Sequence, residues 1–363
     1  MTQAGKVVLV TGVSRDLGRR FARNLADDPA VANVIGVDVI PPEGDLGAVS
    51  FVRADLRNPV VAKLLVRERV DTVVHMSVVA TPGGMGSRAS MKEANVIGTM
   101  QLLGACQRAP DVRRVVVKST TTVYGASHRD PAMFTEDMGP KRMPRSGYSR
   151  DALEIEGYVR GFARRRPDVH VAMLRAANVI GPGVDSPIAQ YFRLPVVPTV
   201  LGYDPRLQFV HEADLTEALR HAVHTDVSGT FNLAGDGVLL LSQAIRRLGR
   251  AGLPVPSFAL SAVGSAIRGA GRSEFAPELV HFLTYGRGVD TTRLREEFGF
   301  TPRYSTEQAF CDFARSVDMP PGVPGLAVAD PALASLERVL ARAHVSSAPR
   351  TPATTAPGGE IDG

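Results

Sequence analysis

The sequence predicts an α/β protein in which a doubly wound parallel sheet is joined to a smaller mixed domain. Short valine-rich apolar runs alternate with helical patterns through the first half of the 363 residues. Strands separated by helices of this length imply right-handed crossovers and a parallel sheet. The second half is broken by prolines, from Pro182 to Pro205, into shorter segments. Because open α/β sheets bind ligands at the carboxyl ends of their strands, we expect a small-molecule site between the two halves.

Each expected element follows from its local pattern. In the first half, strands are expected over residues 6–10, 34–38, 49–54, 72–76, 114–118 and 169–174, and helices over 17–25, 59–69, 89–107 and 148–166. In the second half, strands are expected over 208–210 and 229–233, and helices over 212–224, 242–252 and 306–316, with a further one that follows residues 290–292 and ends near 298–299. We divide the chain into a first domain that carries the sheet (1–175), an interleaved second region (176–318), an extension with a short helix (319–345) and a disordered tail (346–363).

Composition excludes several classes of function. The net charge is +5 and almost all of it is arginine, but no tryptophan is present and the basic stretches lack interleaved aromatics, so no nucleic-acid partner is expected. Two distant cysteines give neither a disulfide framework nor a zinc site. No apolar run reaches the ~18 residues of a membrane span, and strand residues begin at Lys6, so we expect no leader and a cytoplasmic enzyme. The apolar stretch 253–267 is interpreted as a lid or pocket wall, or alternatively as a membrane-facing patch.

A tight turn between the first strand and the first helix predicts a phosphate-binding loop. Free backbone N–H groups and the helix dipole both favour an anion there. The turn keeps its outer glycines, but Arg15 occupies the position of a middle glycine, where it either lies along a pyrophosphate or points to solvent. The residues expected to contact the cofactor here are Gly12, Ser14, Arg15, Asp16, Leu17 and Gly18.

Acidic residues after the second and third strands indicate which dinucleotide binds. Asp38 ends the second strand, where a carboxylate accepts hydrogen bonds from ribose hydroxyls and repels a 2′-phosphate. It therefore favours NAD over NADP. Asp55 and Leu56 follow the third strand and are expected at the adenine edge, although Asp55 could also be an ordinary loop acid.

With these residues identified, the chain resembles the extended short-chain dehydrogenases/reductases, the NAD-dependent epimerase/dehydratase family. The motifs that carry the resemblance occur in order over roughly residues 6–315. They are Thr11-Gly12…Leu17-Gly18, Val37-Asp38, Ala54-Asp55-Leu56, Val73-Val74-His75, Asn95–Thr99, Ser119–Gly125, Leu174-Arg175…Asn178…Gly181-Pro182-Gly183, Phe209-Val210-His211…Asp214-Leu215 and Phe231-Asn232-Leu233. The resemblance implies a Rossmann-like domain that binds NAD, cofactor contacts by Asn95 and Tyr148, a substrate that is often a nucleotide sugar, and a possible homodimer through the two long helices.

The resemblance also implies the catalytic residues. Thr120 matches the hydroxyl residue that orients a substrate oxygen, and Tyr148 matches the tyrosine that passes the proton. The family's lysine, which lowers the tyrosine pKa and holds the nicotinamide ribose, is replaced by Ala152. Period-2 alternation puts Lys118 on the same side of its strand as Thr120, so Lys118 is our candidate substitute, with a lysine at the sheet edge as the alternative.

The substrate side carries fewer signals. Asn178 matches a position that often contacts substrate in the family, and Arg287 could bind a phosphate. Leu207-Gln208 replaces the usual Arg-Asp before Phe209-Val210-His211, which weakens the nucleotide-sugar assignment, and His75 and His211 are expected to be structural. The leading hypothesis is an NAD-dependent oxidoreductase or epimerase acting on a secondary hydroxyl or carbonyl. An NAD-binding protein without turnover and a hydroxysteroid-type dehydrogenase remain alternatives.

Overall fold

The structure, a computed structural model, describes residues 5–78, 88–141, 143–144, 147–256, 259 and 277–317. The predicted extension 319–345, the predicted tail 346–363 and most of the apolar stretch 253–267 lie outside these residues. Within the described ranges, no helix is both long and apolar enough to cross a membrane.

A seven-stranded parallel sheet forms the first lobe, in the order β11-β6-β5-β4-β1-β2-β3. Its strands are β1 (Lys6–Thr11), β2 (Val31–Asp38), β3 (Ser50–Arg53), β4 (Thr72–His75), β5 (Arg114–Thr120), β6 (His170–Ala176) and β11 (Gly229–Leu233). The chain runs outward from β1 in one direction to β3 and then crosses to β4, which makes a topological switch between β1 and β4. The predicted doubly wound α/β fold is confirmed.

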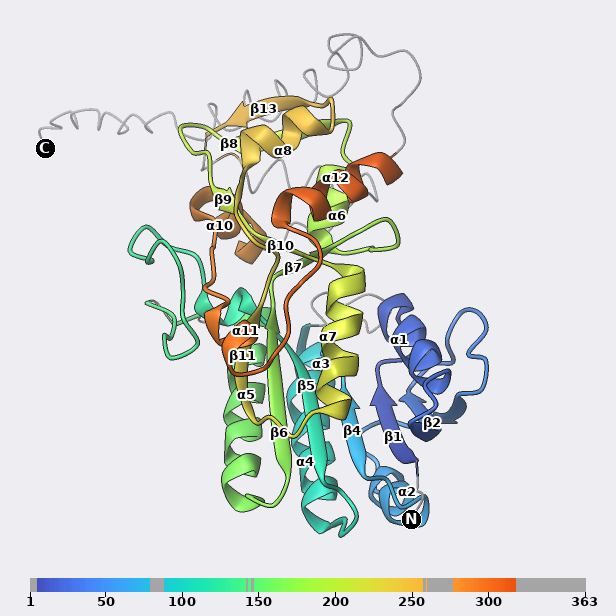
Figure 1. The fold of residues 1–363 in the computed structure, drawn as a ribbon. Helices are drawn as coiled ribbons and strands as arrows, with labels where there is room; N and C mark the ends of the chain where they lie inside the picture. The colour runs from blue at the N-terminus through green and yellow to red at the C-terminus, as the bar shows by residue number, and fades with distance from the viewer. Residues whose placement is uncertain are drawn as a thin grey trace, which may run out of the picture.

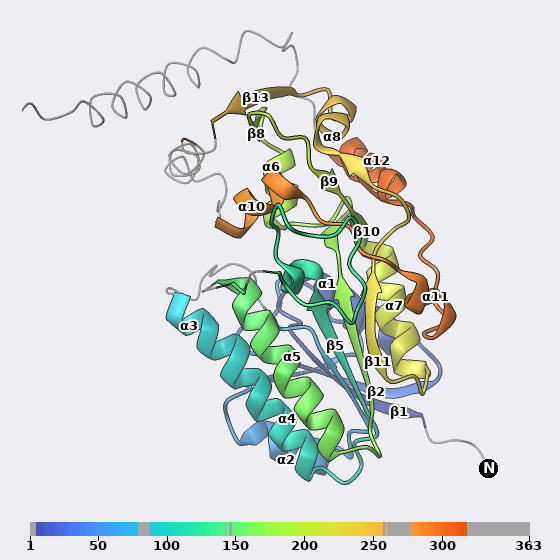
Figure 2. The same cartoon turned by 90° about the vertical axis from the view of Figure 1, so that its left-hand side faces the viewer.

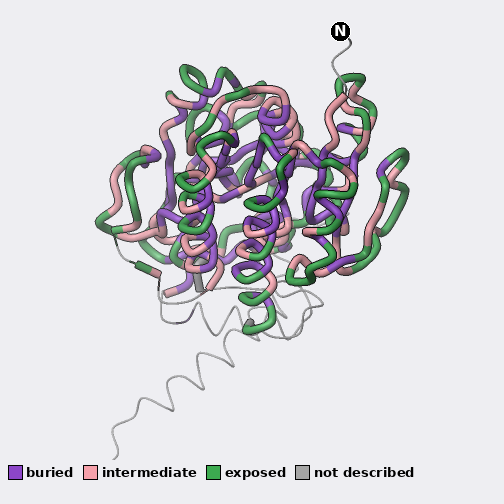
Figure 3. Tube along the Cα trace, turned by 90° about the horizontal axis from the view of Figure 1, so that it is seen from below, coloured by how far each residue is buried: buried purple, intermediate pink, exposed green. Residues whose placement is uncertain are grey.

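Helices cover both faces of this sheet, as Figure 2 shows. One face packs against α2 (Val60–Arg67), α4 (Gly98–Arg108) and α5 (Tyr148–Arg165), and the other against α1 (Asp16–Ala26) and α7 (Glu212–His224). Along β5, Val115 and Val117 belong to the core on the face covered by α2, α4 and α5, and Val116 belongs to the core on the other face. This alternation follows from the pleat of the strand, which points successive side chains to opposite faces. In Figure 3 the buried positions lie along the sheet and on the inner sides of the helices.

The expected helix over 89–107 contains a π-helical turn. It is built from α3 (Arg88–Lys92), the π-helical segment η2 (Glu93–Ile97) and α4. The extra residue of a π turn shifts the phase of the side chains that follow, and such turns occur frequently at functional sites. Here the turn carries Asn95, which is buried against α5.

The second lobe lies beyond the carboxyl ends of the strands (Figure 1). Its elements are β7 (Asn178–Ile180), α6 (Pro187–Phe192), β8 (Val196–Val200), β9 (Arg206–Leu207), β10 (Phe209–His211), β12 (Leu239–Leu240), α8 (Leu241–Arg247), β13 (Ala251–Val255), α10 (Pro277–Tyr285) and α12 (Thr306–Ser316). Aromatic residues of α6, β10 and α12 form its core. The expected helix over 242–252 is wrong in its second half, because Gly249 at φ 63° ends α8 and the chain continues as strand β13.

The chain returns to the first lobe after entering the second. α7 covers one face of the large sheet, β11 pairs with β6 at its edge, and the short helix α11 (Thr292–Glu296) packs against β11. Residues 212–233, which follow the predicted boundary at residue 175, therefore complete the first lobe.

Candidate active site

The turn between β1 and α1 is held in shape by its two outer glycines. Gly12 has φ +83°, and a Cβ there would lie 2.9 Å from the Ser77 amide nitrogen. A Cβ on Gly18 would lie 2.1 Å from the carbonyl oxygen of Gly12, so the helix approaches the turn too closely for any other residue. Arg15 is exposed at the N-cap of α1 and its side chain makes no capping hydrogen bond. The backbone of the turn therefore leaves space at Gly12 and Gly18 that a Cβ on either residue would fill.

The carboxylate of Asp38 is hydrogen-bonded to this turn. The backbone N–H and the hydroxyl of Ser14 both donate to Asp38 Oδ2, at 2.9 and 2.6 Å, and the Val39 N–H donates to Oδ1 at 2.8 Å. The predicted phosphate loop and the predicted ribose-binding acid thus lie side by side. This arrangement, a glycine cradle beside a carboxylate at the end of β2, fits a dinucleotide.

Three further predicted cofactor residues, Asp55, Leu56 and Asp16, differ in the contacts that their side chains already make. Asp55 forms an ion pair with Arg57 at 2.6 Å, and this guanidinium holds the pKa of Asp55 below its usual range. Leu56 packs against the core beneath α2 and α4. Asp16 is exposed and pairs with Arg19 and Arg20 on its own helix. Since Asp55 and Asp16 already have arginine partners, neither carboxylate is free of local ion pairs.

Thr120 and Tyr148 are brought together at the carboxyl end of β5. Thr120 is the last residue of β5, and its Oγ1 accepts the Thr122 N–H at 3.1 Å at the start of the short 3₁₀ helix η3 (Thr121–Tyr124). Tyr148 is the first residue of α5, and its hydroxyl is hydrogen-bonded to Thr120. Burial raises the pKa of Tyr148 to about 12; the hydrogen bond with Thr120 opposes this shift, and the negative charge of Asp151 adds to it.

The position of the family's lysine is occupied by a small buried side chain. Ala152 is 2 % exposed and belongs to the same buried core cluster as Tyr124 and Phe134. Asp151, immediately before it, is fully buried, and its Oδ2 lies 3.5 Å from the Asn95 amide nitrogen in the π-helical turn. Within the described parts of the chain, the charge that acts on Tyr148 is therefore negative.

Lys118 is half-buried on β5, on the same side as Thr120. Burial lowers the pKa of this lysine, and its charge acts on His75 of the neighbouring strand β4. Burial, with a smaller contribution from Lys118, lowers the pKa of His75 to about 4, so this histidine is neutral at physiological pH. Lys118 therefore lies near the carboxyl end of β5, close to β4.

Both histidines that we expect to be structural have partners on each ring nitrogen. His75 bridges the hydroxyls of Thr11 and Thr99, at 2.8 Å each. His211 accepts the Ala213 N–H at the start of α7 and contacts Asp312 at 3.0 Å. No group of three potential metal-binding side chains occurs among the residues that the structure describes.

A buried polar network lies directly beneath Thr120 and Tyr148, and our sequence analysis did not assign it. Glu156 of α5 accepts hydrogen bonds from Ser119 at 2.7 Å and from two nitrogens of Arg175 at 2.9 and 2.8 Å. Arg175 also donates to the hydroxyl of Tyr124, which donates to Asn232 of β11. The sequence contained two indications of this network: the motif Leu174-Arg175, and Glu156, which lies eight residues after Tyr148. The network ties β5, β6, β11 and α5 together under the site.

On the substrate side, Arg287 reaches the same end of β5. It is 9 % exposed, donates to the carbonyl oxygen of Gly125 at 2.7 Å and lies over the ring of Phe282. Burial lowers the pKa of this arginine to about 10. Asn178 is half-buried at the start of β7, two residues beyond Ala176, which pairs with Thr120 in the sheet. Arg287 and Asn178 thus approach the carboxyl end of β5, where Thr120 lies, from two different segments.

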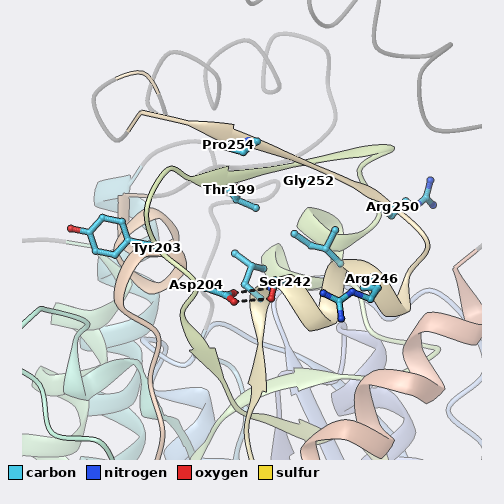
Figure 4. A pocket seen from close by; sticks show the side chains of 10 residues that line it. Thr199, Tyr203, Asp204, Ser242, Arg246, Arg250, Gly252 and Pro254 are labelled. Carbon is cyan, nitrogen blue, oxygen red and sulfur yellow. Dashed lines mark hydrogen bonds between the residues drawn. The ribbon is translucent and has the colours of Figure 1, made fainter.

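A separate pocket of about 450 Å³ lies in the second lobe between β8, β13 and α8. Figure 4 shows Asp204 held by Ser242, with Arg246 and Arg250 farther along the same wall. None of the predicted site residues lines it. The pocket is therefore distinct from the site around Thr120 and Tyr148.

Comparisons with known proteins agree with this geometry. The model of the NAD dependent epimerase/dehydratase family matches residues 8–234. Uncharacterized protein Rv0501 of Mycobacterium tuberculosis is 48 % identical over 323 residues, which cover 88 % of this chain and 86 % of that protein. The solved structure of MoeE5 in complex with UDP-glucuronic acid and NAD has a TM-score of 0.67 at 22 % identity, covering 86 % of this chain and 98 % of its own. A UDP-glucose-4-epimerase from Stenotrophomonas maltophila with bound NAD has a TM-score of 0.67 at 21 % identity, covering 93 % and 99 %. The two structures show the same fold.

Proposed function

The chain belongs to the NAD-dependent epimerase/dehydratase family, and we propose that it is an oxidoreductase or epimerase acting on a secondary hydroxyl or carbonyl of a nucleotide sugar. The observation that carries this proposal is the hydrogen bond between Thr120 and Tyr148 at the carboxyl end of β5. This pair lies at the same edge of the sheet as the glycine turn and Asp38, where parallel strands place their ligands.

The cofactor end has the groups that NAD needs. The backbone of the turn from Gly12 to Gly18 and the first amides of α1 would bind the pyrophosphate, and Asp38 would accept hydrogen bonds from the ribose. Arg15, exposed at the N-cap, would either border the pyrophosphate or remain in solvent. NAD supplies hydride acceptance and donation when bound.

The chain's own residues would position the substrate oxygen and move its proton. Thr120 would hold the oxygen by a hydrogen bond, and Tyr148 would exchange the proton with it. We propose that Lys118 takes over one part of the missing lysine's role, a hydrogen bond to the nicotinamide ribose, since no carboxylate acts on it among the described groups. The other part of that role, lowering the pKa of the tyrosine, cannot be performed by the uncharged side chain of Ala152.

Charge on the substrate side supports a phosphate-bearing substrate. Arg287 is buried without an ion-pair partner among the described carboxylates, and an anion would relieve the cost of that burial. The structural neighbours bind UDP-sugars, as their descriptions state. We therefore propose Arg287 as a contact to the diphosphate and Asn178 as a contact to the sugar side.

A second candidate is an NAD-binding protein without turnover. Ala152 in place of lysine, together with the raised pKa of Tyr148, favours it. In this case the fold would report cofactor or recruit a partner, and Tyr148 would serve only in packing.

One set of assays separates the two candidates. Wild-type protein, Tyr148→Phe and the matched control Tyr158→Phe, an exposed tyrosine of the same helix, are assayed with UDP-glucose and NAD and with UDP-galactose, and NAD binding is measured by calorimetry. The enzyme proposal expects turnover that falls at least about 100-fold in Tyr148→Phe and is retained in Tyr158→Phe. Turnover unaffected by Tyr148→Phe would contradict the assigned role. NAD binding without turnover in the wild type, with turnover in Ala152→Lys, would establish the second candidate.

A further inference from the structure

Ser14 places two hydrogen bonds on a single oxygen of Asp38. Its N–H and its hydroxyl donate to Oδ2 at 2.9 and 2.6 Å, while the Val39 N–H donates to Oδ1 at 2.8 Å. Arg53, which is paired with Asp38 in the sheet, directs its Nε to the carbonyl oxygen of Val39 instead. A carboxylate has about four lone-pair sites, two on each oxygen. Among the residues that the structure describes, these three groups are the donors, so Oδ2 is saturated and one acceptor site remains, on Oδ1.

Two other serines of the chain bind a neighbouring aspartate in a different way. Ser242 donates its N–H to Oδ1 of Asp204 at 2.8 Å and its hydroxyl to Oδ2 at 2.7 Å. Ser127 donates its N–H to Oδ2 of Asp130 at 2.6 Å and its hydroxyl to Oδ1 at 2.7 Å. In both pairs the two donors are divided between the two oxygens. The sharing of one oxygen at the turn is therefore not how a serine must bind an aspartate.

The position of Ser14 is fixed by its neighbours in the turn. The side chain of Val13 is fully buried, and a Cβ on Gly36 of β2 would lie 3.0 Å from its Cγ2. The Gly12 N–H also donates to the Val37 carbonyl oxygen of β2 at 3.2 Å. The turn is thus attached to the strand that carries the carboxylate, and the backbone N–H of Ser14 stays directed at Oδ2.

The hydroxyl of Ser14 competes directly with a ligand hydroxyl for the same oxygen. An O–H donor at 2.6 Å from a carboxylate oxygen makes a strong, charge-assisted hydrogen bond. A ribose hydroxyl that displaced it would exchange one O–H donor for another, with no net gain in hydrogen bonding. A ribose hydroxyl at the vacant site on Oδ1 adds a bond.

We infer that Ser14 is a specificity-determining residue that limits Asp38 to one of the two hydroxyls of the adenosine ribose of NAD. The inference rests on the proposed placement of NAD along the turn, and it deepens that proposal by stating how the ribose is recognised. One hydroxyl, 2′ or 3′, donates to Oδ1 of Asp38. The other gains no acceptor on this carboxylate as long as Ser14 holds Oδ2.

Calorimetry with three cofactors tests the inference without turnover. NAD and its analogues that lack the 2′ or the 3′ hydroxyl of the adenosine ribose are titrated into the wild-type protein. We expect one analogue to bind about tenfold or more weakly than NAD and the other to bind within about threefold of it, because a hydrogen bond to a charged group is lost in one case only.

Removal of the Ser14 hydroxyl should change this pattern. In Ser14→Ala the backbone N–H still donates to Oδ2, but one acceptor site on that oxygen becomes vacant. We then expect both analogues to bind about tenfold or more weakly than NAD. Ser242→Ala is the matched control, because it removes a hydroxyl from a serine–aspartate pair of the second lobe, and it should keep the wild-type pattern.

Three results would overturn the inference and leave the proposed function standing. They are equal weakening of both analogues in the wild type, no weakening of either, and a wild-type pattern in a Ser14→Ala protein whose circular dichroism is unchanged. Absence of NAD binding to the wild type would instead overturn the proposed function, and the inference with it.

Discussion

The two ends of the cleft respond differently to a departure from the family pattern. At the cofactor end, Arg15 replaces a glycine, yet the turn keeps its shape because Gly12 and Gly18 supply the close approach and Ser14 binds Asp38. At the catalytic end, Ala152 replaces a lysine and leaves Tyr148 with an anionic neighbour. A site built from backbone groups tolerates a new side chain in a solvent-facing position. A site that depends on one charged side chain does not tolerate the loss of that charge.

The largest expected effect on cofactor binding comes from a change in the turn at the cofactor end. In Gly18→Ala the new Cβ would lie 2.1 Å from the Gly12 carbonyl oxygen, so the turn and α1 must separate. We expect NAD affinity to fall at least about 100-fold, or roughly 3 kcal/mol, by calorimetry. Gly157→Ala is the matched control, because a Cβ there meets nothing within 4 Å, and it should leave NAD binding unchanged. Normal NAD affinity in a folded Gly18→Ala protein would contradict the role of the turn.

A second change tests the support beneath the catalytic end. Arg175→Met leaves the fully buried carboxylate of Glu156 without its bidentate partner, and we expect unfolding by urea to show a loss of about 3–5 kcal/mol. Arg160→Met removes an exposed arginine from the same carboxylate and should cost less than about 1 kcal/mol. Equal losses in the two variants would show that burial of the network contributes no special stability.

The smallest expected effect is that of replacing Arg15, which tests whether the cofactor end depends on this side chain. Since its side chain is exposed and caps no backbone group, Arg15→Ala should change NAD affinity by no more than about threefold. If its guanidinium instead lies along the pyrophosphate, affinity should fall about tenfold or more, and the loss should shrink as salt is added. Calorimetry at two salt concentrations distinguishes the two positions.

Much of the first lobe could be predicted from its sequence because its elements depend on local patterns. Apolar runs alternating with helical patterns predicted the strands and the fold class, and the family motifs predicted the family, which the comparisons confirm. The π-helical turn at Asn95 was not predictable, since one extra residue in a helix leaves no mark on composition. The strands β8 and β13 were also missed, because each is short and carries a proline.

At the candidate site, the sequence predicted which residues come together better than it predicted how they change one another's pKa. The motif order brings Thr120 to Tyr148 and Ser14 to Asp38, as the structure has them. The effect of Asp151 on Tyr148 depends on complete burial in three dimensions, and no residue spacing gives that. The roles of the individual site residues remain predictions.

The return of the chain to the first lobe has a consequence for how the protein folds. β11 pairs with β6 only after more than fifty intervening residues have been added, many of them in the second lobe. During synthesis, β6 therefore remains an unpaired edge until residue 233 emerges, and an unpaired apolar edge is prone to associate with other chains. Closing this long loop slows folding, and it makes the completion of the nucleotide-binding lobe dependent on the polypeptide that follows it.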